Sequence, residues 1–432
     1  MAVVVALLLV VGSGRAGAQG LADLYEAALR SNPNLKVREF DIERARAESD
    51  GARSRLLPQL FASGEWTANR QTDASAAAQR YAGKRSSLSA RQSLYDAPAR
   101  RRFEATQATV LQRTHELALT RATLFDELLD RYLQVLYAQD TIAALAAETQ
   151  ATARQVDRLR AMRERQMAKV TDVAEAEAYA MALVTRGIDA RNERSTALAR
   201  LAELCGMAVA QVPPLVPMVH APVPGSLEEW TGTALRQHPR LMALLQAVEA
   251  AERQVHASRA EHHPQVAVAL SHVYSNTGYD NRRQPPYHAT SLGLELRVPL
   301  YEGGRVDAAV REAAARLGAA QQQLEAARRE IEREVSTLWS SAQANLARIG
   351  STAAEVQSLE LSVQSQERAL ELGVSRITDL LIARQRLLKA RADQAKARYD
   401  HLRDVVALTT QAGALTSAEI NQWDRWFDSG TR

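Results

Sequence analysis

The sequence is poor in cysteine, in aromatic residues and in uncompensated charge. Its one cysteine, Cys205, excludes an intramolecular disulfide and is predicted to be a small buried apolar side chain. The 54 basic and 50 acidic residues are intermingled and leave a net charge of +4, a weak basis for binding nucleic acid. Aromatic residues make up 5%, whereas alanine, arginine, leucine and glutamate are abundant, which favours long helices. We therefore expect a helical protein without a nucleic-acid partner.

The sequence also lacks a recognisable catalytic constellation. Four histidines could suggest a metal: His256, His262, His263 and His272. No cysteine or pair of carboxylates completes a metal shell around them, and a solvated or headgroup-facing role is favoured. No serine has the glycines of a nucleophile elbow, and the Gly303-Gly304 pair lacks the lysine and the spacing of a phosphate loop. We predict no catalytic residue, no metal and no cofactor.

The N-terminus has the pattern of an export signal. Residues 1–18 hold an apolar run of roughly ten residues, too short to span a bilayer, followed by the small-residue cleavage pattern Ala16-Gly17-Ala18. We predict a signal peptide over 1–18 and a mature chain that begins near Gln19. No cysteine stands there to carry a lipid anchor.

The rest of the chain is an internal duplication. The stretch AALRSNPNL is matched later by TALRQHPRL, and SLYDAPARR is matched by PLYEGGRVD. Pro33 and Pro239 are 206 residues apart, and so are Tyr95 and Tyr301. A shared spacing between separate matches predicts one structural unit that occurs twice.

The two repeats predict the same order of elements. Prolines at the first turn, such as Pro33 and Pro239, mark helix starts. The first repeat is predicted over 19–206, with helices over 21–57 and 102–205 and strands over 58–95. An extended linker over 207–230 leads to a second repeat over 231–412, with helices over 233–263 and 304–411 and strands over 264–301. A C-terminal segment over 413–432 is predicted to partner the linker.

The strand pairs alternate in polarity, and heptad patterns follow them. Leu292, Leu294 and Leu296 alternate with Gly293 and Glu295, which is typical of a transmembrane barrel. Four strands per chain are too few to close a barrel, and an open edge in lipid leaves backbone groups unpaired. Three copies would supply twelve strands. The helices that follow are too long for a compact domain, and two apolar stripes on one of them favour a wall of helices over a two-stranded coiled coil.

Several motifs together resemble the TolC-like family of outer-membrane efflux and secretion channels. They are the repeated N-P-x-L, the L-P-Q-L motif, the strand exit VPLYEGGRV and the paired TDV and TDL turns, spread over essentially the whole mature chain. The resemblance implies an α+β membrane protein, a homotrimeric twelve-stranded β-barrel in the Gram-negative outer membrane that continues as a twelve-helix periplasmic α-barrel. It gives the strand-to-helix turns to Gly303 and Gly304 in one repeat, where positive φ angles are needed, and to Pro98 in the other.

The resemblance also implies a periplasmic gate at the two helical tips. The predicted gate residues are Asp379, Asp172, Arg376, Thr378 and Thr171. Three copies of Asp379 would form a carboxylate ring, and one turn later this chain carries Ile382 where the type member has a second acidic ring. Asp172 would pair with a basic neighbour such as Arg376. The alternative is that each Thr-Asp pair only caps its helix.

The heptads pause at the same tips, where small residues allow another helical hairpin to approach. We predict that a periplasmic adaptor docks there on Gln166, Met167, Ala168, Lys169, Gly373, Val374 and Ser375. The leading functional prediction is a passive exit duct, which is no enzyme. It would meet outer-membrane lipid and be recruited by this adaptor and an inner-membrane transporter, expected to be of the ABC type.

The class of cargo follows less directly from the sequence. The missing lipid-anchor cysteine favours type I protein secretion over small-molecule efflux, which would use the same architecture. A periplasmic structural coiled coil without a pore is the alternative from another class.

Overall fold

The computed structural model describes residues 19–72, 78–216, 222–278, 281–413 and 415–427, so the predicted signal peptide over 1–18 lies outside the described residues. The chain divides into two compact units. The sheet unit comprises Lys36–Leu119 and Pro239–Arg329, and the tip unit comprises Met1–Leu35, Thr120–His238 and Glu330–Arg432. Each unit draws on both halves of the sequence, so the two repeats do not form separate units.

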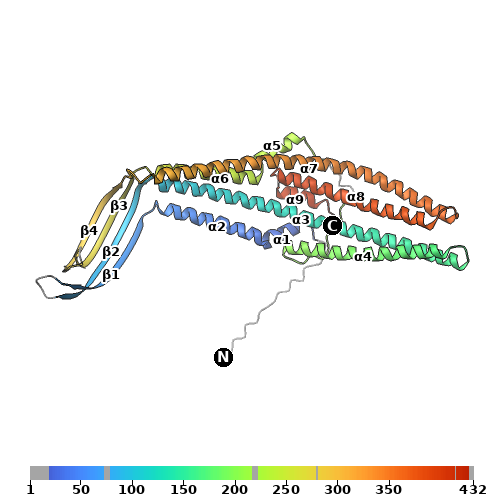
Figure 1. Cartoon of the computed structure of the whole chain (residues 1–432), viewed down its shortest axis with the longest axis horizontal. Coiled ribbons are helices and arrows are strands. Elements are labelled where there is room, and N and C mark those ends of the chain that lie inside the picture. The colour runs from blue at the N-terminus through green and yellow to red at the C-terminus, as the bar shows by residue number, and fades with distance from the viewer. Residues whose placement is uncertain (1–18, 73–77, 217–221, 279–280, 414, 428–432) are drawn as a thin grey trace, which may run out of the picture. The chain divides into compact units, whose positions relative to one another are not determined.

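The elements follow the predicted order in each repeat (Figure 1). They are α1 (Leu21–Ser31), α2 (Pro33–Ser54), β1 (Gln59–Gln71), β2 (Gln79–Asp96), α3 (Ala97–Glu164), α4 (Val170–Cys205), α5 (Leu227–Gln237), α6 (Pro239–Ala260), β3 (Gln265–Thr277), β4 (Arg283–Arg297), α7 (Arg305–Glu371), α8 (Ile377–Gln411) and α9 (Ser417–Asp424).

The sheet unit contains a four-stranded antiparallel sheet in the order β1-β2-β3-β4 (Figure 1). The β1–β2 pairing has no bulge, and the β2–β3 pairing shifts only between Ser93 and Tyr95. Strands β2 and β3 come from different repeats, so the sheet joins the two repeats of one chain. Among the described residues, β1 and β4 each pair on one side only, and the sheet has two open edges.

The two faces of this sheet differ in polarity. Leu292, Leu294 and Leu296 lie on one face, called here the apolar face, and are 73%, 68% and 66% exposed. The opposite, polar face carries the hydrogen-bonded pairs Ser63–Ser87 and Ser271–Ser291, both at 2.7 Å, and the ion pair Arg91–Glu295 at 2.6 Å. A strand that lies between lipid and an aqueous lumen needs apolar side chains on the face toward lipid and polar side chains on the face toward the lumen. The exposed leucines and the polar side chains of the opposite face fit this pattern.

The strands lead into the long helices by two different turns. β2 runs directly into α3, where Asp96 accepts a backbone hydrogen bond at 2.9 Å that caps the helix. Pro98 lies in the first turn, where its missing N–H costs no helical hydrogen bond. Before α7, Gly303 and Gly304 have φ angles of 62° and 81°, in the left-handed region that favours glycine. The two repeats thus make the same turn with different chemistry.

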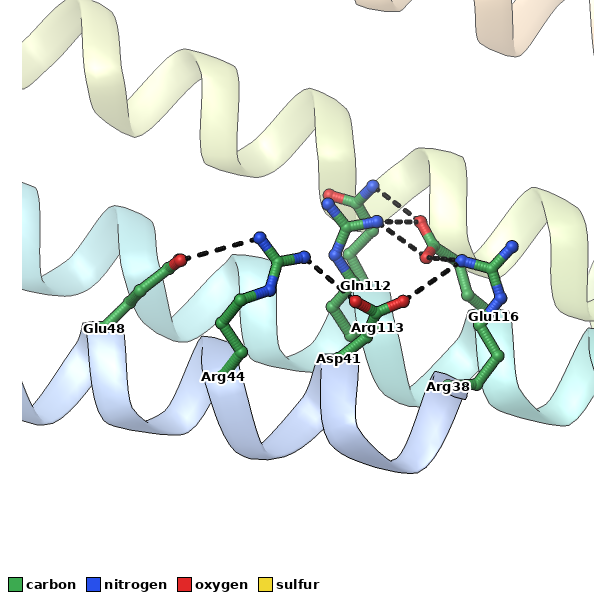
Figure 2. Close-up of polar contacts among 7 residues, drawn as sticks. All are labelled: Arg38, Asp41, Arg44, Glu48, Gln112, Arg113 and Glu116. Atoms are coloured by element: carbon green, nitrogen blue, oxygen red, sulfur yellow. Dashed lines mark hydrogen bonds and ion pairs between the residues drawn. The ribbon is translucent and has the colours of Figure 1, made fainter. Parts of the chain in front are cut away.

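A string of alternating charges joins α2 to the start of α3 (Figure 2). Arg38 and Arg44 lie 3.3 and 3.0 Å from Asp41, and Arg38 also lies 3.9 Å from Glu116 of α3. Arg113 holds Glu116 from within α3 at 2.7 Å. The hydrogen bond from Arg44 lowers the pKa of the Asp41 carboxyl. Solvent screens such exposed pairs, so the string aligns the two helices more than it stabilises them.

In the tip unit the long helices fold back as two hairpins, α3–α4 and α7–α8 (Figure 1). The hairpins share one apolar core near their tips. Its buried residues are Val156, Leu159, Val173, Ala176, Val356, Val363, Ile377, Leu380, Leu381, Ala383, Leu387 and Ala390. Full burial of an aliphatic side chain contributes roughly 1.5–3 kcal/mol, so this core is the main force that holds the hairpins together.

The linker after α4 contacts the C-terminal segment, also within the tip unit. Leu215 forms an antiparallel bridge with Phe427, and the Val216 amide donates to the Trp426 carbonyl at 2.9 Å. Trp423 of α9 stacks on Phe125 of α3, with 5.4 Å between ring centroids. The C-terminal segment is thereby fixed to the long helix by aromatic packing.

Two helical regions of the prediction each contain a break. In the region 21–57, Asn32 separates α1 from α2, because its side chain accepts hydrogen bonds from two amides of α2 while Pro33 has no N–H to continue α1. In the region 233–263, His238 separates α5 from α6, because Pro239 has no N–H to continue α5 and disfavours helical backbone at the residue before it.

Several predicted bounds also need correction. The linker predicted over 207–230 ends at Ser226, whose capping box with Glu229 starts α5. Helix α3 begins at Ala97 and not at residue 102, because Asp96 already caps it. The second strand pair ends at Arg297 and not at 301, shortly before Pro299, which cannot donate to a strand ladder. The C-terminal segment contains α9, which was not predicted.

Candidate functional site

The two hairpin tips have the same backbone geometry. At the first tip the amides of Gln166 and Met167 bond back to carbonyls in the last turn of α3, at 2.9 and 2.8 Å. At the second tip the amides of Gly373 and Val374 do the same in α7, at 3.1 and 2.9 Å. These paired bonds form a Schellman C-cap at each tip.

The residue in the left-handed position differs between the tips. Gln166 has a φ of 59° and Gly373 a φ of 73°. A non-glycine residue in this conformation costs roughly 1–2 kcal/mol. The first tip is therefore the more strained of two otherwise equivalent turns.

Asp379 is the third residue of α8, and its side chain is exposed. The carboxylate accepts a hydrogen bond from the Arg376 amide at 3.3 Å and lies 3.5 Å from the Ser375 hydroxyl. It also lies at a helix N-terminus, where the helix dipole favours negative charge. Capping fixes the position of this carboxylate, and it leaves the charge open to solvent.

The other predicted gate residues make fewer contacts. Asp172 is the third residue of α4 and is half-buried. Within one chain, the described residues form no ion pair between Asp172 and Arg376, so such a pairing stays a prediction for contacts between copies. Thr171 is exposed and Thr378 half-buried, and neither side chain forms a cap among the described contacts.

Both tips expose apolar side chains where adaptor docking is predicted. Met167 is 67% exposed and Val374 78%, and Leu372 beside it is 79% exposed. Ala168 instead packs against the shared core, and the Ser375 hydroxyl donates to Gln366 at 2.7 Å. Lys169 is exposed. The predicted set is therefore mixed: its apolar members can meet a partner, while Ala168 supports the tip from within.

A buried ion cluster, which no sequence pattern indicated, joins the two hairpins. Arg384 of α8 is 6% exposed, donates to Glu367 of α7 at 2.6 Å and lies 3.7 Å from Glu148 of α3. Burial raises the pKa of Glu148, an effect that the Arg384 charge opposes. A buried cation between two carboxylates from different helices fixes their alignment, since removal of one partner leaves charge unpaired.

The same positions in the first hairpin hold a pair of reversed sign. Arg160 and Glu177 lie 207 residues before Glu367 and Arg384, and they are bonded at 2.7 Å. Their side chains are 56% and 43% exposed, whereas that of Arg384 is 8% exposed. A search of the repeats for charge-reversed pairs at a fixed offset could have found this cluster.

A second missed group is the buried carboxylate of Asp126 in α3. The Thr410 hydroxyl of α8 lies within hydrogen-bonding distance of both its oxygens, at 2.8 and 2.9 Å. Burial raises the pKa of Asp126 to about 7, against the opposing effect of the Thr410 hydrogen bond. The described residues contain no group of three or more side chains that could hold a metal ion. None of the described helices is both long and apolar enough to cross a membrane.

Comparison with known proteins decides the family. The family model described as "Outer membrane efflux protein" matches residues 24–207 and again 230–414. The chain belongs to this family. The two matches begin 206 residues apart, which confirms the duplication predicted from the sequence.

Individual relatives agree with this assignment. The chain is 29% identical to the alkaline protease secretion protein AprF of Pseudomonas aeruginosa, over 96% of this chain and 88% of the relative. It is 24% identical to the outer membrane protein TolC of Vibrio cholerae, over 93% and 92%. The crystal structure of the outer membrane protein VceC of Vibrio cholerae superimposes with a TM-score of 0.80 at 19% identity, over 91% and 96% of the two chains, and shows the same fold.

Several predictions are thereby confirmed. The chain is a TolC-like outer-membrane channel protein of Gram-negative type, with a periplasmic tunnel, and not an enzyme. Its fold class is the one predicted, an α+β membrane protein with four barrel strands per chain and long helices, the architecture of the trimeric channels. The coarse function is that of an outer-membrane channel in export systems of several components.

Proposed function

We propose that three copies of this chain form a passive exit duct for proteins. The observation that carries the proposal is the two-faced sheet with two open edges. If β4 of one copy pairs with β1 of the next, the antiparallel order continues through twelve strands and no edge is left unpaired in lipid. The apolar face then meets outer-membrane lipid, and the polar face lines the lumen.

The gate of this duct would be the second hairpin tip. Asp379 is exposed and fixed by its hydrogen bond from the Arg376 amide, so three copies near the axis would present a ring of oriented carboxylates. Ile382, one turn later, is 48% exposed and would add an apolar ring in place of a second acidic one. The first tip, with Asp172, would pack outside this ring and hold it closed.

Docking of a periplasmic adaptor would use the apolar side chains of both tips. Met167 and Val374 occupy equivalent positions and are both largely exposed. A partner hairpin that covers them would also contact Lys169 and Gly373. Energy for export would come from an inner-membrane transporter, which we expect to be of the ABC type.

For the cargo, the name of AprF, a protease secretion protein at 29% identity, supports type I protein secretion. The efflux of small molecules through the same architecture is the second candidate, and the family's description as efflux proteins supports it.

A complementation experiment separates the two cargo classes. The chain is expressed in cells that lack their own outer-membrane duct, together with either a protease-secreting transporter and its adaptor or a drug pump and its adaptor. We expect protease in the medium in the first strain and little gain of drug resistance in the second. Drug resistance without protease secretion would assign the duct to efflux. Absence of heat-modifiable trimers from the outer membrane would contradict the duct itself.

A further inference from the structure

The side chains on the apolar face of the sheet become more polar toward the loops that connect β1 to β2 and β3 to β4. Near the helices its rows hold leucine and valine, as in the pairs Leu270–Leu292 and Val268–Leu294. Further from the helices the register pairs Tyr274 with His288, and Trp66 with Lys84. Side chains with an apolar body and a polar tip favour the boundary between hydrocarbon and headgroups. The loop end of this face therefore lies at a lipid–water boundary if the sheet spans the membrane as proposed above.

The boundary residues contact one another. The Lys84 amine lies 5.4 Å from the centroid of the Trp66 ring, and Trp66 is 79% exposed. The rings of Tyr274 and His288 are 5.1 Å apart, and those of His272 and His288 are 5.7 Å apart. These contacts order the aromatic groups on their strands and leave the Lys84 charge exposed.

Beyond this row the face becomes cationic. Arg70 is directly opposite Arg80 in the register, and both are exposed. They lie four residues from Trp66 and Lys84, so all four side chains share one face. Like charges directly opposite each other in a sheet are destabilising. Among the described residues, Arg70, Arg80 and Lys84 form no ion pair, and Asp73 of the adjoining loop lies outside the described residues.

The polar face of the same strands is different, because it carries charges of both signs. Arg91 and Glu295, for example, form an ion pair across the sheet at 2.6 Å. On the apolar face, by contrast, none of the described strand residues from the row of Leu292 to the loops is acidic. The loop end of the apolar face thus carries cations and, among the described strand residues, no acidic side chain.

We propose that Arg70, Arg80 and Lys84 bind the phosphate groups of anionic outer-leaflet lipids. A phosphate between the two arginines would remove their mutual repulsion and gain charge-assisted hydrogen bonds. Lys84 would take a second anionic group while the Trp66 ring lies at the top of the acyl chains. This inference rests on the proposed membrane-spanning role of the sheet, and it adds a lipid class to it.

The test measures lipid preference at the surface of the inserted trimer. The full-length protein is reconstituted into phosphatidylcholine vesicles that contain either spin-labelled phosphatidic acid or spin-labelled phosphatidylcholine, and the fraction of immobilised label is compared. The test variant combines Arg70→Gln, Arg80→Gln and Lys84→Gln. A matched control removes three charges from the polar face of the same sheet, through Arg85→Gln, Arg91→Gln and Arg297→Gln.

We expect a preference for phosphatidic acid that falls by at least about fivefold in the triple variant and stays unchanged in the control. Heat-modifiable trimers in every sample verify insertion. Equal preference in the wild type and the test variant, or an equal loss in the control, would overturn the proposal while the duct stands. Failure of the wild type to insert into any vesicle would instead contradict the proposed membrane role.

Discussion

The first and second hairpin tips are copies that now differ in strain, burial and charge. Both end in a Schellman cap, yet Gln166 holds the left-handed position in one and Gly373 in the other. Val170 is 67% exposed at the first tip, whereas its counterpart Ile377 is 2% exposed at the second. Duplication has kept the backbone, which the turn geometry requires, and has let the side chains adapt to different surroundings.

The charged pairs above the tips show the same divergence. Arg160–Glu177 is exposed, whereas the reversed pair Glu367–Arg384 has its arginine buried and a third partner in Glu148. The second hairpin thus contributes eight of the buried residues of the shared core, and the first contributes four. This asymmetry suits one hairpin for the gate and the other for its outer support.

The largest effect should come from the left-handed glycine. Gly373→Trp should abolish export while trimers remain in the outer membrane, because a large side chain at a φ of 73° strains the cap and fills the space where an adaptor would approach. Cargo in the medium and trimers in membrane fractions are measured. Gln166→Trp is the control and should impair export less, because that position already carries a side chain. Unimpaired export in Gly373→Trp would remove the docking proposal.

A smaller effect, on stability, is expected from the buried arginine. Arg384→Ala should lower the free energy of unfolding of the helical part by about 3 kcal/mol, because it leaves Glu148 without its buried counter-charge. Glu177→Ala in the first hairpin should cost at most about 1 kcal/mol, as exposed pairs do. Denaturant unfolding followed by far-UV circular dichroism measures both. Similar losses in the two variants would mean that burial does not distinguish the pairs.

The most gradual effect is a pH dependence carried by the first repeat. Asp126 has a pKa of about 7 in the folded chain, above the usual value of an aspartate, so the folded state binds the proton more tightly than the unfolded chain. Stability should therefore fall as pH rises from about 4 to 7, by at most about 1.4 kcal/mol per pH unit. Its counterpart in the second repeat, Glu332, is exposed.

Asp126→Asn keeps an acceptor for the Thr410 hydroxyl and removes the charge. It should raise the melting temperature at pH 8 and leave it nearly unchanged at pH 4, whereas Glu332→Gln should change neither. Thermal melts of the purified protein at both pH values give the comparison. If the wild-type melting temperature rises between pH 5 and pH 7, and Asp126→Asn melts at the same temperature as the wild type at pH 8, this assignment is refuted.

Much of the fold was predictable because it depends on repeated local patterns. Proline positions, strand alternation and heptads indicated the order of elements and the two-faced sheet. The break at Asn32 and the start of α5 after Ser226 depend on hydrogen bonds from side-chain caps. The periodic spacing of apolar residues does not reveal such caps. The cluster around Arg384 joins residues more than 200 positions apart, so only the packed structure brings Glu148 to it.

At the candidate site the sequence indicated the turns but not their asymmetry. The Thr-Asp pairs suggested caps, and the side chain that caps in the second tip is Asp379, with neither threonine taking part among the described contacts. The equivalence of Asp172 and Asp379 in sequence concealed a difference in exposure: Asp172 is half-buried and Asp379 is exposed, although both helices contribute side chains to the shared core.

The most direct test of the account is the ion selectivity of single channels in a planar bilayer. The reversal potential under a salt gradient at neutral pH is measured for the wild type, Asp379→Asn and Asp172→Asn. Asparagine keeps an acceptor for the Arg376 amide, so only the charge changes at the second tip. We predict that the wild type favours cations, that Asp379→Asn weakens this preference and the block by multivalent cations, and that Asp172→Asn leaves selectivity intact. Unchanged selectivity and block in Asp379→Asn would contradict a carboxylate ring at the constriction and return Asp379 to the role of a helix cap.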